Sequence, residues 1–411
     1  MTVTREMLEA LNEGSLTDGL PALGTTSMNV TVGDIVLTVS VDDGTLEVIE
    51  GSREAQFSYT LDQETWNGFC ADPPARSYTT AQSVYAALGG SCVSGDRTAW
   101  ATYAPILDRL LETLRAQVVG PRPARNEEPA PTRAVSPIVG GYLQLDVAGT
   151  SNRIYFETAG EGQSVLCLHT AGADSRQFRH LMEDEELTSR YRFVAFDMPW
   201  HGRSDPPTEW ATTTYALTTE TYAATVLAFM DALALDRPVL MGCSMGGAIA
   251  LYLASQNGDR FIGVCALEGG LGNPGRFVPW SNHLEVDHSA FLTSWVGGLI
   301  SPSSPSGPRN QTLWGYAQSG PGVYQGDTYF YCNDLPEKAA NLTPATCPLW
   351  VFSGEYDYSA TTEMSRAAAE KLGGQLVEMP GSGHFPMSED PAVFRSFLVP
   401  VLDKITQPGA S

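Results

Sequence analysis

The chain has 411 residues, 43% hydrophobic and 17% charged, a length that suits two folded domains and a composition that excludes a mainly disordered or fibrous protein. Its 24 Lys and Arg against 47 Asp and Glu give a formal charge of −23, which opposes contact with phosphate backbones and anionic lipid, so we expect no nucleic-acid partner. No run approaches the ~20 apolar residues that cross a bilayer, and the first residues show no secretory pattern, so we expect no membrane insertion.

Residues 1–118 are predicted to form a small α+β domain. Between Met28 and Val48 apolar and polar residues alternate, as in strands with one buried face, and the Asp-Asp-Gly at 42–44 is typical of a hairpin turn. A further strand is expected over Ala55–Leu61. Apolar residues at helical spacing predict an amphipathic helix over Tyr103–Leu114.

The order of these features resembles the sterol-carrier-like lipid-binding domain. The matching elements are the hairpin around Asp43 and Gly44, an aromatic patch near Trp66, the turn at Gly95-Asp96 and the closing helix. The resemblance implies a site for an apolar, lipid-like ligand. The alternative is a packing module without a ligand, through which the protein would form a homo-oligomer.

A linker is expected next, because Val119–Pro137 is rich in proline and charge and lacks an apolar period. We assign residues 119–136 to this linker and 137–411 to a second domain. In this second domain, segments of helix length separate short apolar runs rich in β-branched residues. The runs lie at 165–168, 193–196, 239–241, 262–267 and 349–352. Such runs indicate a mostly parallel sheet covered on both faces. Alternating patterns at 142–147 and 153–157 predict antiparallel edge strands.

A cap is predicted at about 271–342, where a segment rich in Gly, Pro and Ser is too long for an ordinary connection. The segment is also dense in aromatic residues, namely Trp280, Trp295, Trp314, Tyr316, Tyr324, Tyr329, Phe330 and Tyr331. These side chains indicate either a pocket for an apolar or aromatic group or the small core of the cap itself.

The sharpest chemical signal is the sequence PVLMGCSMGGAIALYLAS, in which an apolar strand runs into Ser244 and a helix of small residues follows. Gly242 and Gly246 complete a G-x-S-x-G motif in the strand–turn–helix context that a nucleophile elbow requires. Such a turn presents the Ser244 hydroxyl above the sheet. Cys243 belongs to the strand, so its thiol is expected to be buried.

A serine nucleophile needs a base within hydrogen-bond reach. His384 is the predicted base, in the glycine-rich loop MPGSGHFPMSEDP that follows an apolar strand over Gln375–Met379. The acid expected to orient its imidazole is Asp357, which follows the strand and turn CPLWVFSG. Glu268, at the end of FIGVCALEGG, is the reserve candidate. The predicted catalytic residues are therefore Ser244, His384 and Asp357.

The order of these three residues, together with the elbow, resembles the α/β-hydrolase family from about Ser136 to the C-terminus. The loop DMPWHGRSDPP at 197–207 is similar to a family loop that ends in Gly-x-Ser. The resemblance implies an α/β-hydrolase fold with a cap insertion and a serine esterase that needs no metal or organic cofactor. The seven widely spread cysteines form no Cys/His cluster, which favours a reduced, cytoplasmic protein without a metal site.

The resemblance also implies an oxyanion hole made of two main-chain amides. The amide after the nucleophile is that of Met245, and the second is matched by Ala171 in the loop LHTAGADSRQF at 168–178. This loop departs from the family pattern because Thr170 stands where the family has glycine, and its hydroxyl is a candidate donor. His169 is expected to support the loop.

Six residues are candidates for substrate contact, namely Thr170, Arg176, Gln177, Trp280, Trp314 and Tyr316. Arg176 could hold a substrate carboxylate through a bidentate pair, or it could pair with one of the local acids, Glu183, Asp184 and Glu185.

The sequence therefore predicts hydrolysis of an ester of a small or medium-sized carboxylic acid through an acyl-enzyme. Lactones, thioesters, amides and carbon–carbon bonds of diketones stay open as substrates, because fold and triad do not fix the substrate. A non-catalytic ligand-binding protein on the same scaffold is the alternative outside enzymes.

Overall fold

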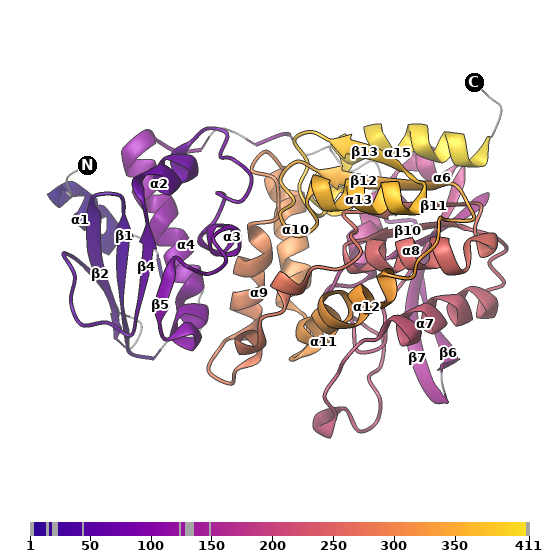
Figure 1. Ribbon diagram of the computed structural model, residues 1–411, viewed down its shortest axis with the longest axis horizontal. Helices are drawn as coiled ribbons and strands as arrows, with labels where there is room; N and C mark the ends of the chain where they lie inside the picture. The colour runs from indigo at the N-terminus through magenta and orange to yellow at the C-terminus, as the bar shows by residue number, and fades with distance from the viewer. Residues whose placement is uncertain are drawn as a thin grey trace. The chain divides into compact units, whose positions relative to one another are not determined.

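The computed structural model describes residues 4–13, 16–18, 24–42, 45–122, 125–127, 135–147 and 149–407. Its contacts divide the chain into two compact units (Figure 1). The first unit combines the residues up to Arg125 with Val278–Ser303, and the second combines Asn126–Phe277 with Ser304–Ser411. The segment 271–342, predicted as one cap of the second domain, is thus divided between the units.

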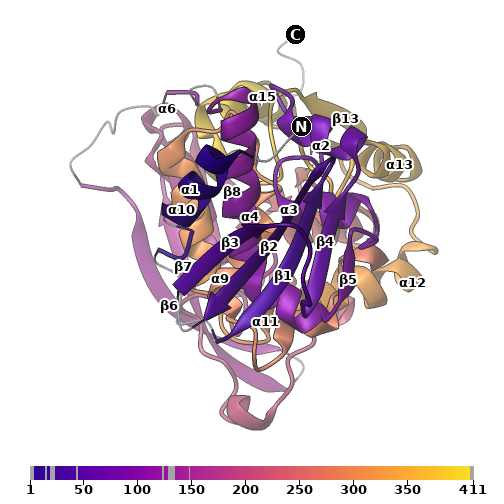
Figure 2. The same ribbon diagram turned by 90° about the vertical axis from the view of Figure 1, so that its left-hand side faces the viewer.

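A five-stranded sheet forms the first unit, and its strands lie in the order β3-β2-β1-β4-β5 (Figure 2). The strands are β1 (Thr26–Val32), β2 (Ile35–Asp42), β3 (Thr45–Glu50), β4 (Phe57–Leu61) and β5 (Val93–Gly95). The pairs β1–β2, β2–β3 and β4–β5 are antiparallel, whereas β1 and β4 run parallel. The helices of this unit are α1 (Arg5–Glu13), α2 (Gln63–Cys70), α3 (Ala81–Ala87), α4 (Arg97–Val119) and α9 (His288–Gly297).

A tight turn that the sequence analysis missed divides the alternating segment. Val32 pairs with Ile35, so Gly33 and Asp34 form a two-residue hairpin loop. Gly33 has φ +58°, a conformation that glycine adopts without steric cost. The turn predicted at 42–44 falls partly on residues 43 and 44, which lie outside the described residues; Asp42 pairs with Thr45 across it.

The helix α4 is longer than the predicted 103–114. Asp96 caps its first turn by accepting hydrogen bonds from the amides of Thr98 and Ala99 at 2.8 and 3.2 Å. The helix ends before Gly120, which has φ +88°. It therefore extends to Val119, the first residue of the predicted linker, half of which lies outside the described residues.

Aromatic packing joins Val278–Ser303 to the first unit. The indole of Trp100, on α4, is fully buried and lies against the ring of Trp280 with 5.1 Å between centroids. Tyr85 stacks on Trp100 at 4.2 Å, and its ring also lies edge-on to Trp280. The hydroxyl of Thr79 donates a hydrogen bond to the carbonyl of Gly298 at 2.8 Å. A segment that follows the elbow in sequence therefore completes the core of the N-terminal unit.

The second unit contains an eight-stranded, mostly parallel sheet in the order β13-β12-β11-β10-β8-β9-β7-β6. Its strands are β6 (Val139–Val147), β7 (Thr150–Ala159), β8 (Gln163–Leu168), β9 (Tyr191–Phe196), β10 (Val239–Cys243), β11 (Gly263–Leu267), β12 (Leu349–Gly354) and β13 (Gln375–Met379). The pairs β6–β7 and β7–β9 are antiparallel, and the other pairs are parallel. The predicted strands, including the two antiparallel edge strands, are confirmed.

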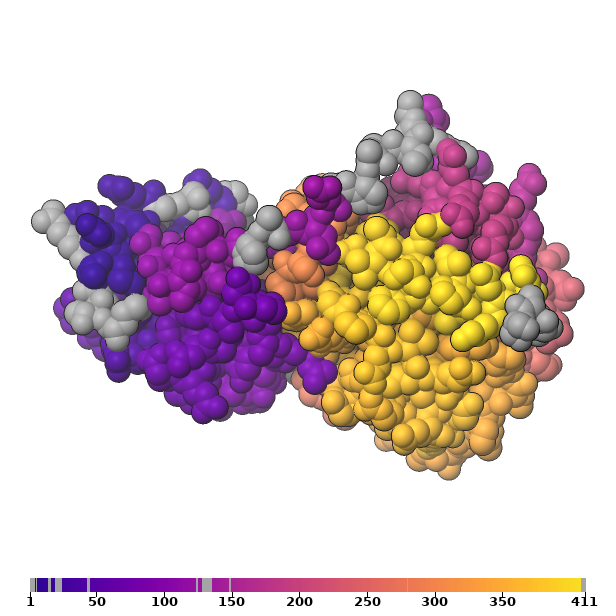
Figure 3. All heavy atoms as spheres, turned by 90° about the horizontal axis from the view of Figure 1, so that it is seen from above, coloured from indigo at the N-terminus to yellow at the C-terminus, as the bar shows by residue number. Residues whose placement is uncertain are grey.

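Helices cover both faces of this sheet. The helices of this unit are α5 (Arg179–Glu183), α6 (Glu185–Thr188), α7 (Thr219–Ala232), α8 (Met245–Gln256), α10 (Ser306–Ala317), α11 (Val323–Tyr329), α12 (Leu335–Ala339), α13 (Thr362–Leu372), α14 (Pro386–Glu389) and α15 (Pro391–Thr406). One face packs its apolar side chains against α5, α6, α14 and α15. The other is covered by α7, α8 and α13 (Figure 1). C-terminal segments occupy much of the surface seen in Figure 3.

The part of the cap that belongs to the second unit is helical, with α10, α11 and α12 and a π-turn over Phe330–Asp334. The composition of this segment suggests loops. Instead, Asn, Gln and Glu occupy exposed positions of the helices, and Tyr316, Val323 and Leu335 face inward. Among the described helices none is long and apolar enough to cross a membrane.

Candidate active site

Ser244 lies at a strained turn between β10 and α8. Its φ of 55° and ψ of −113° are unusual for a residue with a side chain, and such a conformation costs about 1–3 kcal/mol. The surrounding main chain holds it: the Ser244 amide donates to the carbonyl of Leu267, and its carbonyl accepts from the amide of Ala248, both at 2.8 Å. Strain of this kind, fixed by the fold, is characteristic of functional sites.

The two glycines of the motif permit the turn because there is no room for a side chain at either position. A Cβ atom at Gly242 would lie 2.1 Å from the carbonyl oxygen of Gly246. A Cβ atom at Gly246 would lie 2.3 Å from the carbonyl oxygen of Leu168, on the neighbouring strand β8. The motif therefore reflects close backbone contact on both sides of Ser244.

His384 and Asp357 form a buried hydrogen-bonded pair. Nδ1 of His384 lies 2.7 Å from Oδ2 of Asp357. The other oxygen of Asp357 accepts from the amides of Ser359 and Ala360 at 2.6 and 3.1 Å. Because a carboxylate oxygen accepts, Nδ1 carries the proton, and Nε2 keeps a lone pair for another partner. Asp357, rather than the reserve candidate Glu268, is thus the acid hydrogen-bonded to His384.

The loop that carries His384 is fastened to the elbow. The thiol of Cys243 donates to the carbonyl of His384 at 3.2 Å, and burial raises the pKa of this thiol well above its usual value. The Ser244 hydroxyl is half-buried and forms no hydrogen bond to any residue that the structure describes, His384 included. Hydrogen bonds between nucleophile and base are often long without substrate and shorten when it binds.

Two buried amides near the elbow are uncommitted. In the loop after β8 the neighbouring amides are engaged, that of Thr170 by Gln177, that of Gly172 by Asp327 and that of Ala173 by Thr170. The amides of Ala171 and Met245 donate to no described residue, although both residues are buried. Buried amides normally have partners, so these two are available to an oxygen atom of a ligand.

Asp327, from α11 in the cap, holds this loop and was not singled out from the sequence. Its Oδ2 accepts from the amide of Gly172 and from Nε2 of His201, each at 2.7 Å. Its Oδ1 accepts from the hydroxyl of Tyr215 at 2.8 Å. Nδ1 of His201 faces the carbonyl of Pro199 at 2.9 Å. Since both ring nitrogens face acceptors, His201 is a cation paired with Asp327.

Burial and charge act in opposite directions on the two neighbouring histidines. Burial disfavours the charged form of His201, but the charge and hydrogen bond of Asp327 outweigh it and raise the pKa. Burial, followed by the nearby His201, lowers the pKa of His169. Nε2 of His169 accepts from the amide of Met198 at 3.0 Å, and Nδ1 donates to the carbonyl of Thr170 at 2.8 Å. His169 is therefore a neutral side chain that supports the loop.

A small pocket adjoins the elbow. Ser244, Met245, Glu268, Asn273, Tyr331 and Ser359 contribute to its lining. It holds about 20 Å³ and belongs entirely to the second unit. Its size suits a small group beside the Ser244 hydroxyl.

The six candidate substrate contacts are placed elsewhere than in this pocket. The Thr170 hydroxyl lies 2.5 Å from the Tyr316 hydroxyl and 3.1 Å from Oε1 of Gln177. These three residues are therefore linked by hydrogen bonds through Thr170. Arg176 pairs with Asp174, with its Nε at 2.8 Å and Nη2 at 2.5 Å from that carboxylate. The partner is thus a local acid, though none of the three named from the sequence.

The two tryptophans among these candidates have other surroundings. Trp280 packs on Trp100 and Phe291 in the first unit. Trp314 is 62% exposed. Their roles as substrate contacts stay predictions.

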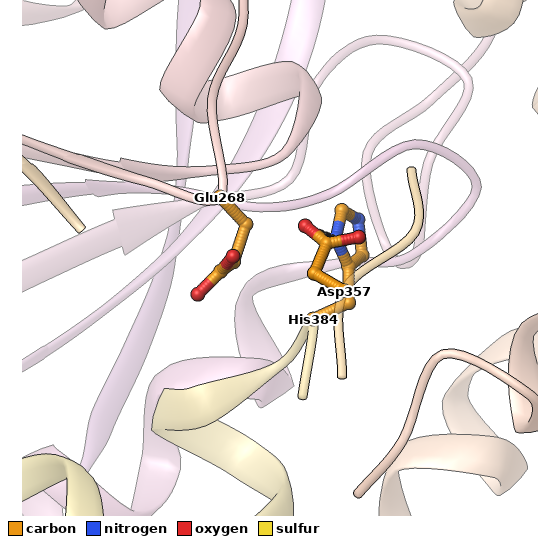
Figure 4. Close-up of side chains that lie close together, drawn as sticks. All are labelled: Glu268, Asp357 and His384. Atoms are coloured by element: carbon orange, nitrogen blue, oxygen red, sulfur yellow. Dashed lines mark hydrogen bonds and ion pairs between the residues drawn. The ribbon is translucent and has the colours of Figure 1, made fainter. Parts of the chain in front are cut away.

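One cluster of side chains with metal-like spacing is present among the described residues: Glu268, Asp357 and His384 each place one atom within 4.8 Å of the others (Figure 4). His384 already bonds Asp357 through Nδ1. Burial, followed by the charge of Asp357, raises the pKa of Glu268 well above its usual value. Because Asp357 and His384 are already bonded to each other, we treat the cluster as part of the acid–base site.

The strand order, the elbow and the pair of acid and base define an α/β-hydrolase architecture. A model of the alpha/beta hydrolase family matches residues 165–397, more than half of the chain. The chain belongs to this family.

Individual relatives cover only parts of the chain. It is 33% identical over 141 residues to the dihydrolipoyllysine-residue acetyltransferase component of the acetoin cleaving system of Cupriavidus necator, covering 34% of this chain and 35% of that protein. It is 28% identical over 141 residues to 2-hydroxy-6-oxononadienedioate/2-hydroxy-6-oxononatrienedioate hydrolase 1 of Dechloromonas aromatica, covering 34% and 47%. The chain thus spans about a third to a half of the length of these curated relatives.

Among solved structures, the enol-lactonase of Burkholderia xenovorans is similar with a TM-score of 0.54 and 22% identity, covering 64% of this chain and 99% of that one. At this identity the likeness is one of fold.

Proposed function

We propose that the protein is a serine hydrolase that cleaves the ester of a small carboxylic acid through an acyl-enzyme. The observation that carries the proposal is the strained Ser244, whose hydroxyl has no hydrogen-bond partner among the described residues and which lines a small pocket. A strained serine between a strand and a helix is the arrangement of a nucleophile elbow.

In the proposed mechanism Ser244 attacks the acyl carbon while Nε2 of His384 takes its proton. Asp357 holds the imidazole by its hydrogen bond to Nδ1 and balances the positive charge that forms on the ring. The amides of Ala171 and Met245 donate to the oxyanion, each worth about 3–4 kcal/mol in comparable sites. His384 then protonates the leaving alcohol and activates the water that releases the acid. These steps need no metal or organic cofactor.

Hydrolysis of lactones or of carbon–carbon bonds is the second candidate. It is favoured by the similarity to a 2-hydroxy-6-oxononadienedioate hydrolase and by the fold shared with an enol-lactonase. The same nucleophile, base and oxyanion donors serve all of these reactions, because each proceeds through an attack on a carbonyl carbon. Thioesters fall in the same class.

A panel of chromogenic esters of increasing acyl length, assayed beside lactones, thioesters and a vinylogous diketone, tests the proposal. We expect the highest kcat/KM for short acyl groups, because the pocket is small. Turnover of the diketone alone would replace ester hydrolysis by carbon–carbon cleavage. Turnover of none of these, with Ser244 inert to an organophosphonate, would favour a non-catalytic ligand-binding protein.

For the first unit we propose an apolar ligand site. A cavity of about 390 Å³ is lined by Val32, Ile35, Trp66 and Val118, with Asp34, Gln63, Asn67 and Cys70 as the polar residues of its lining. Trp66 is 3% exposed and stacks on Phe69, so a ligand would alter its fluorescence. Quenching or a blue shift on titration with a fatty acid, lost in Val118→Arg, supports the site; unchanged fluorescence with no retained lipid supports a packing or oligomerisation role.

A further inference from the structure

A third buried carboxyl group adjoins the pair of Asp357 and His384, and the proposed mechanism does not use it. Glu268 follows β11 and is 1% exposed. Its two carboxyl oxygens lie 2.8 and 2.9 Å from the amide nitrogen of Gly354, which donates to them. Its φ of +47° is strained for a residue with a side chain. The main chain therefore holds the Glu268 carboxyl in one orientation, with an oxygen within 4.8 Å of ligand atoms of Asp357 and His384, which lie close by in Figure 4.

Glu268 and Asp357 are both buried, and a carboxyl oxygen of each lies within 4.8 Å of the other. Two carboxylates in contact in a dry site do not both ionise, so one of them keeps a proton. Asp357 receives the amides of Ser359 and Ala360 as well as the imidazole, all of which stabilise its charged form. Glu268 receives a single amide. The hydrogen bonds therefore favour ionisation of Asp357 over that of Glu268, so a proton kept by the pair resides on Glu268.

Other titratable groups face this pair from neighbouring elements. Glu389, on α14, accepts from the amide of Gly383 at 2.5 Å and acts on Glu268 through its charge. Cys243 faces the pair from β10, and burial keeps its thiol protonated. The charge of Glu389 favours the neutral form of Glu268, whereas the Cys243 thiol is uncharged; His384 faces the pair through its hydrogen bond to Asp357.

We propose that Glu268 is a positioning residue of this active site, which as a neutral acid donates a hydrogen bond to Asp357 and holds that carboxylate against His384. The inference rests on the proposed function. By taking up part of the charge of Asp357, the donated hydrogen bond also limits how strongly that carboxylate stabilises the protonated imidazole. Removing the donor should move the acidic limb of the pH profile of kcat/KM to higher pH.

The pH profile of kcat/KM separates this role from a merely structural one. Glu268→Gln keeps a donor for Asp357 and an acceptor for Gly354, so we expect kcat/KM within about threefold of the wild type and an unmoved acidic limb. Glu268→Leu, similar in size, has no donor, and we expect kcat to fall about tenfold or more, with the acidic limb shifted to higher pH. An impaired Gln variant, or a Leu variant with an unmoved limb, would overturn the proposal.

A second measurement covers the case in which Glu268→Leu does not fold. The wild-type protein should show the infrared C=O stretching band of a protonated carboxylic acid at neutral pH, and Glu268→Gln should lack it. A wild-type spectrum without that band would refute the neutral acid. Organophosphonate labelling of Ser244 is measured in parallel: if the band is present but Ser244 does not label, the proposed function fails while the hydrogen bond between the two acids stands.

Discussion

The thiol of Cys243 donates a hydrogen bond to the main-chain carbonyl of His384 at 3.2 Å, across a separation of 141 residues in sequence. Cys243 is the residue before the strained Ser244, so this contact fixes the loop of the base to the turn of the nucleophile. Because His384 is also bonded to Asp357, the base has two attachments, one at its main-chain carbonyl and one at Nδ1 of its imidazole.

Substitutions of Ser244 should abolish activity whatever their effect on the stability of the protein. We expect Ser244→Ala to lower kcat by three or more orders of magnitude. Ser244→Gly should be equally inactive but more stable than Ser244→Ala, by about 1 kcal/mol, because glycine adopts a positive φ without the steric cost. Hydrolysis rates and urea denaturation of the two variants check both statements. Equal stabilities would show that the turn stores no strain.

Gly246 should tolerate no side chain. We expect Gly246→Ala to lose activity and about 2 kcal/mol or more of unfolding free energy, since the added Cβ would meet the carbonyl oxygen of Leu168 at 2.3 Å. Gly315→Ala is the control, because a Cβ there meets nothing within 4 Å, and a helix interior favours alanine. Similar effects of the two substitutions would contradict the close-packed elbow.

The pair of His201 and Asp327 should make stability depend on pH. The folded-state pKa of His201 is raised above its ordinary value of 6.5, so the pair stabilises the protein fully below that pH and less as pH rises through the raised value. Asp327→Asn should therefore cost about 3 kcal/mol near pH 6, and less near pH 9. Thermal unfolding of both proteins across this range gives the difference.

Asp327→Asn should also affect the reaction, because Asp327 holds the amide of Gly172 beside that of Ala171. We expect a fall in kcat with a smaller change in KM, as for loss of an interaction made in the transition state. A rise in KM at unchanged kcat would place Asp327 in substrate binding instead.

The aromatic cluster of the first unit should be essential to the stability of both segments that form this unit, the N-terminal residues and Val278–Ser303. Trp100→Ala should cost about 3–5 kcal/mol, since a fully buried indole between Tyr85 and Trp280 is lost. Deletion of residues 1–118 should expose Trp280 and Phe291, detected as a red-shifted tryptophan emission and aggregation. A soluble, active and unshifted deletion variant would show that Val278–Ser303 folds without its partner residues.

The sheet of the second unit could be predicted from the sequence. Short, continuous apolar runs such as the one before Ser244, separated by segments of helix length, are typical of buried parallel strands. The sequence also predicted Ser244, Asp357 and His384 as catalytic residues, each of which follows a strand of a parallel sheet. Glycine spacing, strand ends and loop composition are the local signals behind this prediction, and the structure joins two of the three residues, His384 and Asp357, by a hydrogen bond.

Contacts between residues far apart in the chain could not be predicted from local sequence patterns. Asp327 reaches Gly172 over 155 positions, and nothing in the local pattern around Asp327 indicates a partner on the loop after β8. The allocation of Val278–Ser303 to the first unit depends in the same way on packing against Trp100. The turn at Gly33 could have been recognised, since a Gly-Asp pair inside an alternating segment is itself a hairpin signal.

The central claim, that Ser244 becomes acylated, is tested most directly by mass spectrometry of the protein quenched in acid during turnover of a short-chain activated ester. The account predicts an added acyl mass on the peptide that contains Ser244, absent from Ser244→Ala and strongly reduced in His384→Ala. Turnover with no acyl mass on that peptide, or with the mass on another residue, would contradict it.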